Sequence, residues 1–212
     1  MNINENITSN ILTIIKDNTI DFNEDFKILN IYYDVLLPID TLKEEYKNLT
    51  IVNYKIQDPY TIDLDCDEKF NYIIFNEVIE KIVNYNSFLN NLKKYLEHNG
   101  KIICSIQNIM SRDVLKDVLN GRFTYTNEGI LNKSNLRFFT LEEIRRLFDK
   151  ERYDLNNILA IMNNPTKEEE EFINDLCNIT SEKLKINFSA NSFILSASKK
   201  INKTLFDYVL NT

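Results

Sequence analysis

Six short apolar segments, separated by segments with helical periodicity, constrain the fold of this 212-residue chain more than any other feature. This alternation is typical of a parallel sheet whose strands are joined by crossover helices. We therefore predict an α/β fold with a mostly parallel sheet flanked by helices. The expected strands are residues 27–33, 49–56, 71–75, 101–106, 155–162 and 192–198.

Helices are predicted between these strands and at both ends of the chain. Residues 87–98 carry an apolar stripe at helical spacing, and Asn99-Gly100 then turns the chain into the next strand. Thr140 with Glu143, and Thr166 with Glu169, have the spacing of capping boxes, so helices should begin directly after each Thr. The acidic run 168–171 then falls in a first helical turn, where we expect it to face solvent.

The sequence contains no repeat and no low-complexity linker, so a single domain is expected over residues 1–212. We predict an N-terminal helical segment over 1–25, packed on the sheet through 7–15. The α/β core should occupy 26–200. A C-terminal helix is expected within 201–212.

Charge and composition limit the partners. The formal net charge of −7 argues against nucleic acid, because phosphate binding depends on clustered Lys and Arg. No apolar run is long enough to span a membrane and the first residues do not resemble a secretory signal, so a cytoplasmic protein is expected. Three scattered cysteines and one histidine, His98, predict no metal site. A small molecule or another protein is the expected partner.

Three pieces between residues 70 and 140 carry a family resemblance: "FNYIIFNEVIEK", "LNNLKKYLEHNGKIICSIQN" and "VLNGRFTYTNEGILNKSNLRFFTLEEIRRLF". The last extends slightly beyond that range. Together they resemble class I S-adenosylmethionine-dependent methyltransferases, in particular the branch often found beside or fused to bacterial glycosyltransferases. The resemblance implies a Rossmann-like methyltransferase fold. It also implies a cofactor site at the carboxyl ends of the strands.

The expected cofactor site departs from the family pattern. A glycine-rich turn should follow the first strand, because the backbone must approach the ligand closely. The corresponding text, "KILNIYYDVLLPID", contains no glycine, and the chain's glycines lie downstream at 100, 121 and 129. We expect bulky side chains, Val35 included, to fill the space for the methionine moiety. The positions that correspond to cofactor contacts are Ile31, Tyr32, Tyr33, Asp34, Asn53 and Asn76.

Two further departures concern the length and the catalytic side. The segment between residues 56 and 71 is too short for the helix and strand that the family usually has there, which predicts a shortened second half-unit. Lys81 and Asn135 stand where the family has histidines, the usual choice for a general base. The remaining weak catalytic candidates are Glu77, Glu80, Asn135 and Arg137.

Each candidate has a structural alternative. Glu77 and Glu80 either contact a ligand or cap the following turn and face solvent. Arg122 and Arg137 either hold a phosphate or pair with a carboxylate such as Glu128 or Glu142. The aromatic residues beside them are expected in the core, or as a lid over the sheet edge, rather than as a stacking platform: Phe123, Tyr125, Phe138 and Phe139.

Three functions follow as hypotheses. The first is a methyltransferase-like protein without cofactor that acts as a non-catalytic binding or scaffold module for a protein partner or a glycan-related small molecule. The second is an active S-adenosylmethionine-dependent methyltransferase with an atypical site and a sugar, glycan or other small acceptor. The third is an assembly domain detached from a glycosyltransferase, which predicts a homodimer with a large apolar interface.

Overall fold

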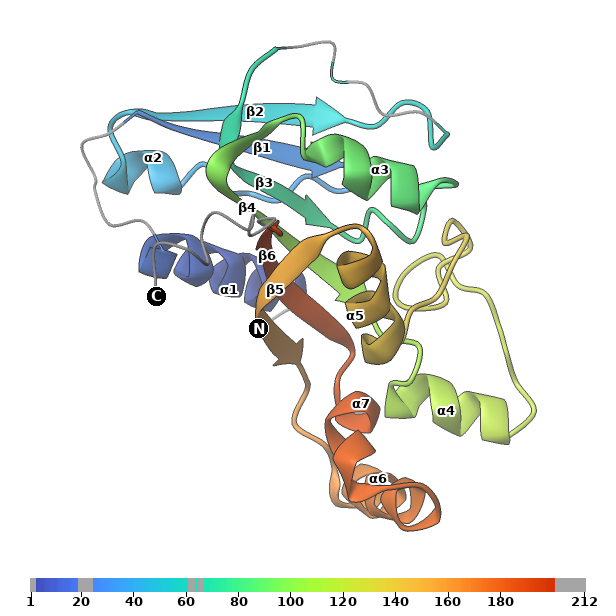
Figure 1. Cartoon of the computed structure of the whole chain (residues 1–212). Helices are drawn as coiled ribbons and strands as arrows, with labels where there is room; N and C mark the ends of the chain where they lie inside the picture. The colour runs from blue at the N-terminus through green and yellow to red at the C-terminus, as the bar shows by residue number, and fades with distance from the viewer. Residues whose placement is uncertain (1–2, 19–24, 61–63, 65–66, 201–212) are drawn as a thin grey trace, which may run out of the picture.

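The structure, a computed structural model, describes residues 3–18, 25–60, 64 and 67–200. It contains one six-stranded sheet with the order β2-β1-β3-β4-β6-β5 (Figure 1). The first four strands in this order pair in parallel, and β6 is antiparallel to both of its neighbours. The Rossmann-like fold predicted from the sequence is confirmed. The strands are β1 (Phe26–Tyr32), β2 (Leu49–Lys55), β3 (Phe70–Asn76), β4 (Leu96–Gln107), β5 (Tyr153–Ile161) and β6 (Ser192–Lys199).

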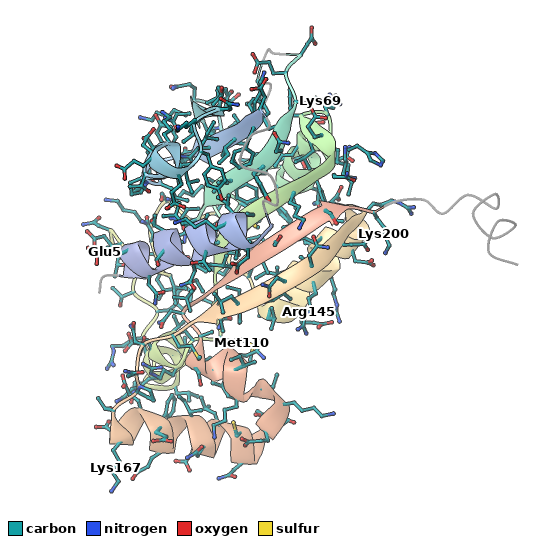
Figure 2. The ribbon with its side chains drawn as sticks, turned by 90° about the vertical axis from the view of Figure 1, so that its left-hand side faces the viewer. Glu5, Lys69, Met110, Arg145, Lys167 and Lys200 are labelled. Atoms are coloured by element: carbon teal, nitrogen blue, oxygen red, sulfur yellow. The ribbon has the colours of Figure 1, made fainter. Side chains whose placement is uncertain are left out.

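Each face of the sheet is covered by helices whose apolar stripes point inward. On one face α1 (Ile3–Asn18) buries Ile7, Ile11 and Ile15 beside α2 (Leu42–Glu45). Figure 2 shows α1 lying across this face, with Glu5 near its start. The opposite face carries α3 (Tyr85–Leu92) and α5 (Leu141–Lys150). The expected helix near the N-terminus is confirmed, whereas the helix predicted within 201–212 lies outside the described residues.

The predicted helix over 87–98 ends too late. In the structure α3 ends at Leu92, and Leu96 already pairs with Phe70 as the first residue of β4. Extra residues in β4 then shift the register before Lys101 pairs with Tyr72. Gly100 makes this irregularity possible, because a Cβ there would lie 2.9 Å from the backbone nitrogen of Glu97 and 2.9 Å from the carbonyl oxygen of Phe70.

Two helix starts follow the predicted caps. The Thr140 side chain accepts a hydrogen bond from the backbone N–H of Glu143 at the start of α5. Thr166 and Glu169 form the complete reciprocal capping box of α6 (Lys167–Ile179). Between β2 and β3, the described residues form no helix or strand. The second half-unit of the fold is therefore short where the sequence predicts it.

A helical insert interrupts the hairpin of β5 and β6. It consists of α6, the 3-10 turn η1 (Glu182–Leu184) and α7 (Lys185–Ser189), and it packs beside α4 (Arg112–Leu119). Its own small apolar cluster contains Ile173, Leu176, Cys177 and Phe188. Figures 1 and 2 place it at the opposite end of the molecule from β2, with Lys167 at its tip.

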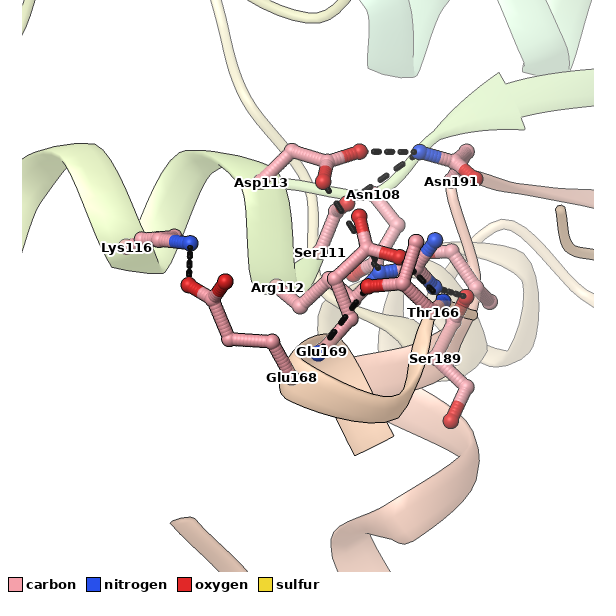
Figure 3. A network of polar contacts seen from close by, with 11 residues as sticks. Asn108, Ser111, Arg112, Asp113, Lys116, Thr166, Glu168, Glu169, Ser189 and Asn191 are labelled. Atoms are coloured by element: carbon pink, nitrogen blue, oxygen red, sulfur yellow. Dashed lines mark hydrogen bonds and ion pairs between the residues drawn. The ribbon is translucent and has the colours of Figure 1, made fainter. Parts of the chain in front are cut away.

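A polar network joins this insert to α4 (Figure 3). The buried Arg112 lies 3.5 Å from the Glu169 carboxylate and donates to the Ser189 carbonyl oxygen. Nearer the surface, Lys116 pairs with Glu168 at 2.7 Å. The acidic first turn of α6 therefore stabilises the helix start and also docks it on α4, which refines the expectation that the run only faces solvent. None of the helices in the described ranges is long and apolar enough to cross a membrane.

Candidate functional site

The strand order fixes where a ligand can bind. After β1 the chain moves outward to β2, and after β3 it moves to β4 on the other side, so the connections diverge between β1 and β3. In open α/β sheets, ligands bind in the crevice at the carboxyl ends of the strands at such a switch point. The turns after Tyr32 and Asn76 border this crevice.

An ion pair crosses the crevice. Asp34, two residues beyond β1, accepts a hydrogen bond of 2.7 Å from the ammonium group of Lys81, which follows β3. The side chain of Lys81 is only 8% exposed, whereas that of Asp34 is 50% exposed. The Lys81 ammonium also lies 5.8 Å from the centre of the Tyr33 ring, within the range of a cation–π contact. These three side chains link the two turns that flank the switch point.

Breaking this ion pair from its two sides should have unequal effects. In Asp34→Asn the buried ammonium of Lys81 loses its charged partner, so we expect a loss of about 1–2 kcal/mol in the free energy of unfolding. In Lys81→Met an apolar chain of similar length replaces the buried charge, and the remaining Asp34 is solvated, so the change should stay within about 1 kcal/mol. Urea denaturation of both variants at neutral pH measures the difference. Equal losses in the two variants would show that burial of Lys81 carries no cost.

A second polar cluster gathers around Gln107, the last residue of β4. Its backbone N–H donates to Oε1 of Glu80 at 2.7 Å, and its side-chain oxygen accepts from the Asn135 amide at 2.9 Å. The side chain of Gln107 also interacts with the Glu77 carboxyl group, which opposes the rise in the pKa of that group. Three of the four catalytic candidates named from the sequence therefore meet at one residue, on the carboxyl edge of the sheet.

Glu80 is buried, contrary to the expectation that it caps the next turn and faces solvent. Its backbone carbonyl accepts from the N–H groups of Leu136 and Arg137, so the loop that follows α4 covers it. Burial raises the pKa of Glu80 to about 8, although the hydrogen bond from the Gln107 backbone opposes the shift. Oε2 of Glu80 is buried without a hydrogen-bond partner among the described residues. A carboxyl group in this state is protonated at neutral pH.

Glu77 adds local strain at the same edge. Its φ angle is 51°, in the left-handed region that residues other than glycine, Asn and Asp rarely occupy. Burial also raises the pKa of its carboxyl group. Strained backbone and raised carboxyl pKa values both occur preferentially at functional sites, although structural networks produce them as well.

Arg137, the fourth catalytic candidate, lies outside this cluster. Its guanidinium group donates to the Ile82 carbonyl at 3.1 Å and stacks 5.0 Å from the centre of the Tyr85 ring. The expected pairing of the two arginines with Glu128 or Glu142 is wrong, since Arg122 instead pairs with Asp117. Arg137 fastens the loop 121–139 to the turn between β3 and α3.

The aromatic residues of this loop are mostly not in the core. Phe123, Tyr125 and Phe138 contact one another edge-on or tilted, and the first two are exposed, so the core alternative of the prediction is wrong for these two and the lid alternative stays a prediction. Only Phe139 is buried, against Tyr85.

The positions named for cofactor contact have other partners in the structure. Ile31 is buried in the core, and Tyr32 is half-buried at the end of β1. Asn53 is exposed and accepts a hydrogen bond from the buried Asn30, while Asn76 accepts one from Ser105 at 2.7 Å. Val35, expected to project into the crevice, is 58% exposed to solvent. Of the positions named, Tyr33 and Asp34 contact Lys81 between the two turns.

S-Adenosylmethionine makes three demands on such a crevice: close approach of the backbone, an acceptor for the ribose hydroxyls and a favourable field for a positive sulfonium. The turn after β1 has no glycine, and the ribose position holds an amide, which binds hydroxyls less strongly than a carboxylate. The Lys81 ammonium beside the crevice is paired with the Asp34 carboxylate, so this ion pair brings no net charge to the sulfonium position. The residues of the turn and of the ribose position therefore depart from the family pattern for backbone approach and for ribose binding.

Gln107 and Lys81 are the central residues of the two clusters, and neither was among the candidates named from the sequence. Gln107 directly follows the predicted strand 101–106, so its place at the carboxyl edge was available from the strand assignment. Lys81 was noted only as a replaced histidine.

These features define a Rossmann-like α/β protein with a polar carboxyl edge, and comparison with known proteins shows its family. A sequence profile described as "Methyltransferase domain" matches residues 15–160. The chain therefore belongs to the methyltransferase domain family.

The individual relatives are distant. A mitochondrial ubiquinone biosynthesis O-methyltransferase of Dictyostelium discoideum is 23% identical over 130 residues, which cover 61% of this chain and 40% of that protein. The matched region thus spans less than half of the relative's length. A protein from Bacillus halodurans described as a methyltransferase has a similar structure, with a TM-score of 0.56 and 11% identity over 89% of this chain and 98% of its own.

An O-methyltransferase from a trans-AT PKS multienzyme of Brevibacillus brevis, solved with S-adenosyl-L-homocysteine, gives a TM-score of 0.53 at 13% identity. The match covers 91% of this chain and 72% of that one. At these identities the structural neighbours establish the fold and not the activity.

Proposed function

We propose that this protein is a methyltransferase-like protein that has lost S-adenosylmethionine binding and acts as a non-catalytic binding or scaffold module. The observation that carries the proposal is the Asp34–Lys81 ion pair across the crevice between β1 and β3. The sheet, the helix caps and both core faces are intact, whereas the turn after β1 lacks the features that hold the cofactor. Selective change at the site with retention of the fold is what loss of cofactor binding would leave.

The expected partner is a protein or a glycan-related small molecule. The net charge of −7 supports this proposal against nucleic acid. The link to glycan or surface modification rests on the resemblance of residues 70–140 to the branch found beside glycosyltransferases.

Calorimetric titration tests the loss of cofactor binding. We expect no heat of binding when S-adenosylmethionine or S-adenosylhomocysteine is added to the wild-type protein at concentrations up to about 1 mM. At this concentration the titration would detect any complex with a binding free energy of more than about 4 kcal/mol. The Brevibacillus brevis O-methyltransferase, solved with the latter compound, is the positive control. Lys81→Ala removes the side chain that crosses the crevice, and we expect this matched variant to regain weak binding of the cofactor. Micromolar binding by the wild type would refute the proposal.

A second candidate function is an active methyltransferase with a small acceptor such as a sugar or glycan. The observation in its favour is the pair Glu77 and Glu80, whose pKa values are both raised at the carboxyl edge of the sheet. This candidate predicts a reaction between methyl-tritiated S-adenosylmethionine and a pool of small sugars that serve as acceptors. The products would be S-adenosylhomocysteine and a tritium-labelled sugar. Activity that disappears in Glu80→Gln would favour it over the scaffold proposal.

A further inference from the structure

β2 is the outermost strand on one side of the sheet, and in the described part of the chain no strand pairs with its outer edge (Figure 1). Edge strands are usually protected by proline, by a bulge, by inward charges or by a covering segment, because their free N–H and C=O groups recruit other strands. β2 has none of the first three: it pairs with β1 over seven residues without a register shift, and Lys55 at its end is its only charged residue.

Two described contacts of the chain that follows β2 join it to the region around α3 and the start of β4. The Pro59 carbonyl accepts from the N–H of Val83 at 2.9 Å, and the N–H of Leu64 donates to the Tyr95 hydroxyl at 3.3 Å. Both contacts lie toward α3 and the start of β4.

The main-chain groups that point outward can be assigned. The Asn48 carbonyl accepts from Phe26, and the Ile56 N–H donates to Tyr32, so residues 48 and 56 turn their main-chain groups toward β1. The direction alternates along a strand, and the register has no shift. Residues 50, 52 and 54 therefore face β1, and Ile51, Asn53 and Lys55 present their N–H and C=O groups outward.

We infer that this outer edge of β2 pairs antiparallel with β2 of a second copy of the chain, around a two-fold axis at Val52. In this register Ile51 lies opposite Asn53 of the other copy, and vice versa, and each such pair can exchange two hydrogen bonds. In this register the odd-numbered residues of one copy lie opposite odd-numbered residues of the other. The main-chain groups that face outward from the two copies therefore meet. The two sheets become one continuous sheet.

The side chains on β2 fit this self-pairing. At the axis Val52 meets its own copy, and on either side Thr50 meets Tyr54, an aromatic and β-branched pair of the kind that stabilises sheets. Lys55 lies opposite Leu49, so no like charges are directly opposed. A two-fold interface needs such a self-complementary surface.

The other outer strand of the sheet differs. β5 has a register shift between Leu155 and Asn157, whereas each of the two outer strands carries one charged residue, Asp154 in β5 and Lys55 in β2. The register shift is therefore the difference, since a bulge protects an edge. Of the two edges, β2 is therefore the one open to a second copy, and this conclusion does not depend on whether the crevice binds a ligand.

Light scattering coupled to size exclusion, and sedimentation equilibrium, test this inference on the full chain. We expect a concentration-dependent species of about 50 kDa, twice the chain mass of 25.1 kDa. Val52→Lys places two ammonium groups at the axis and should raise the dissociation constant about tenfold or more. Leu159→Lys on β5 is the matched control, because Leu159 and Val52 are both 36% exposed, and it should leave the dimer unchanged.

A charge-complementation experiment separates interface loss from misfolding. Val52→Glu alone should also weaken self-association, whereas an equimolar mixture of Val52→Lys and Val52→Glu should form a heterodimer at least as tight as the wild-type dimer. A wild-type protein that remains monomeric over the full concentration range would overturn the inference. So would a dimer that persists in Val52→Lys or dissociates in Leu159→Lys, and so would a mixture that fails to associate.

Discussion

Raising the pH from about 5 to about 9 will lower the free energy of unfolding of the wild-type protein much more than that of the Glu80→Gln variant. The buried Glu80 carboxyl holds its proton up to a pH of about 8, whereas the unfolded chain releases it near the ordinary pKa of 4.5. Between these values unfolding releases a proton, so rising pH favours the unfolded state. The stabilisation is complete below pH 4.5 and is lost as the pH rises through 8.

The size of this effect is on the order of 5 kcal/mol at most, from 1.36 kcal/mol for each unit of pKa difference. Glutamine is neutral at every pH and retains an oxygen to accept the hydrogen bond from the Gln107 backbone. Denaturant unfolding across this pH range measures the slope. Glu97→Gln, at an exposed position in β4, is the matched control and should leave the slope at its wild-type value. The raised pKa of Glu77 acts in the same direction, so a residual slope should remain in Glu80→Gln.

Gly100→Ala is the second large effect, and we expect a loss of about 3 kcal/mol in the free energy of unfolding. The new methyl group would lie 2.9 Å from two backbone atoms, which belong to Glu97 and Phe70 and cannot move aside as a flexible side chain can. Overpacking of this kind usually costs about 1–3 kcal/mol, and unyielding neighbours place it at the upper end. Urea denaturation monitored by tyrosine fluorescence measures the change.

Gly121→Ala provides the comparison. Gly121 has a φ angle of 75° and no atom within 4 Å of an added Cβ, so only the left-handed backbone conformation opposes alanine, at a cost of about 1 kcal/mol. A loss in Gly100→Ala no greater than that in Gly121→Ala would mean that the start of β4 rearranges without cost.

Most of the fold could be predicted because its signals are local. All six strands lie within a few residues of the apolar runs, and both helices that follow a predicted Thr cap begin at the next residue. The end of α3 was wrong because Tyr95 and Leu96 continue the helical stripe. Both are buried, but from an irregular start of β4 whose register depends on pairing with β3, a contact that helical periodicity does not report.

The candidate site was predicted less completely, because its decisive contacts are distant in sequence. Asp34 and Lys81 are 47 residues apart, and nothing near either one indicates the other. The solvent-facing cap, one of the two alternatives given for Glu80, is wrong because this residue is buried. Its burial arises from the loop that brings Leu136 and Arg137 to its carbonyl. Glu77 and Asn135 could be named from the family resemblance, but their meeting at Gln107 required the fold.

The helical insert between β5 and β6 has a consequence for how the sequence can vary. Its ends meet where Ile161 pairs with Ser192, and the N–H of Asn191 donates to the Ile161 carbonyl at 2.8 Å. The pairing of β5 with β6 is thus complete where the insert begins. Additional residues in the insert raise only the entropic cost of closing a longer loop, and this cost grows slowly with length. Residues 162–190 can therefore change in length without altering the sheet register, provided that Glu169 and the Ser189 carbonyl keep their contacts with the buried Arg112.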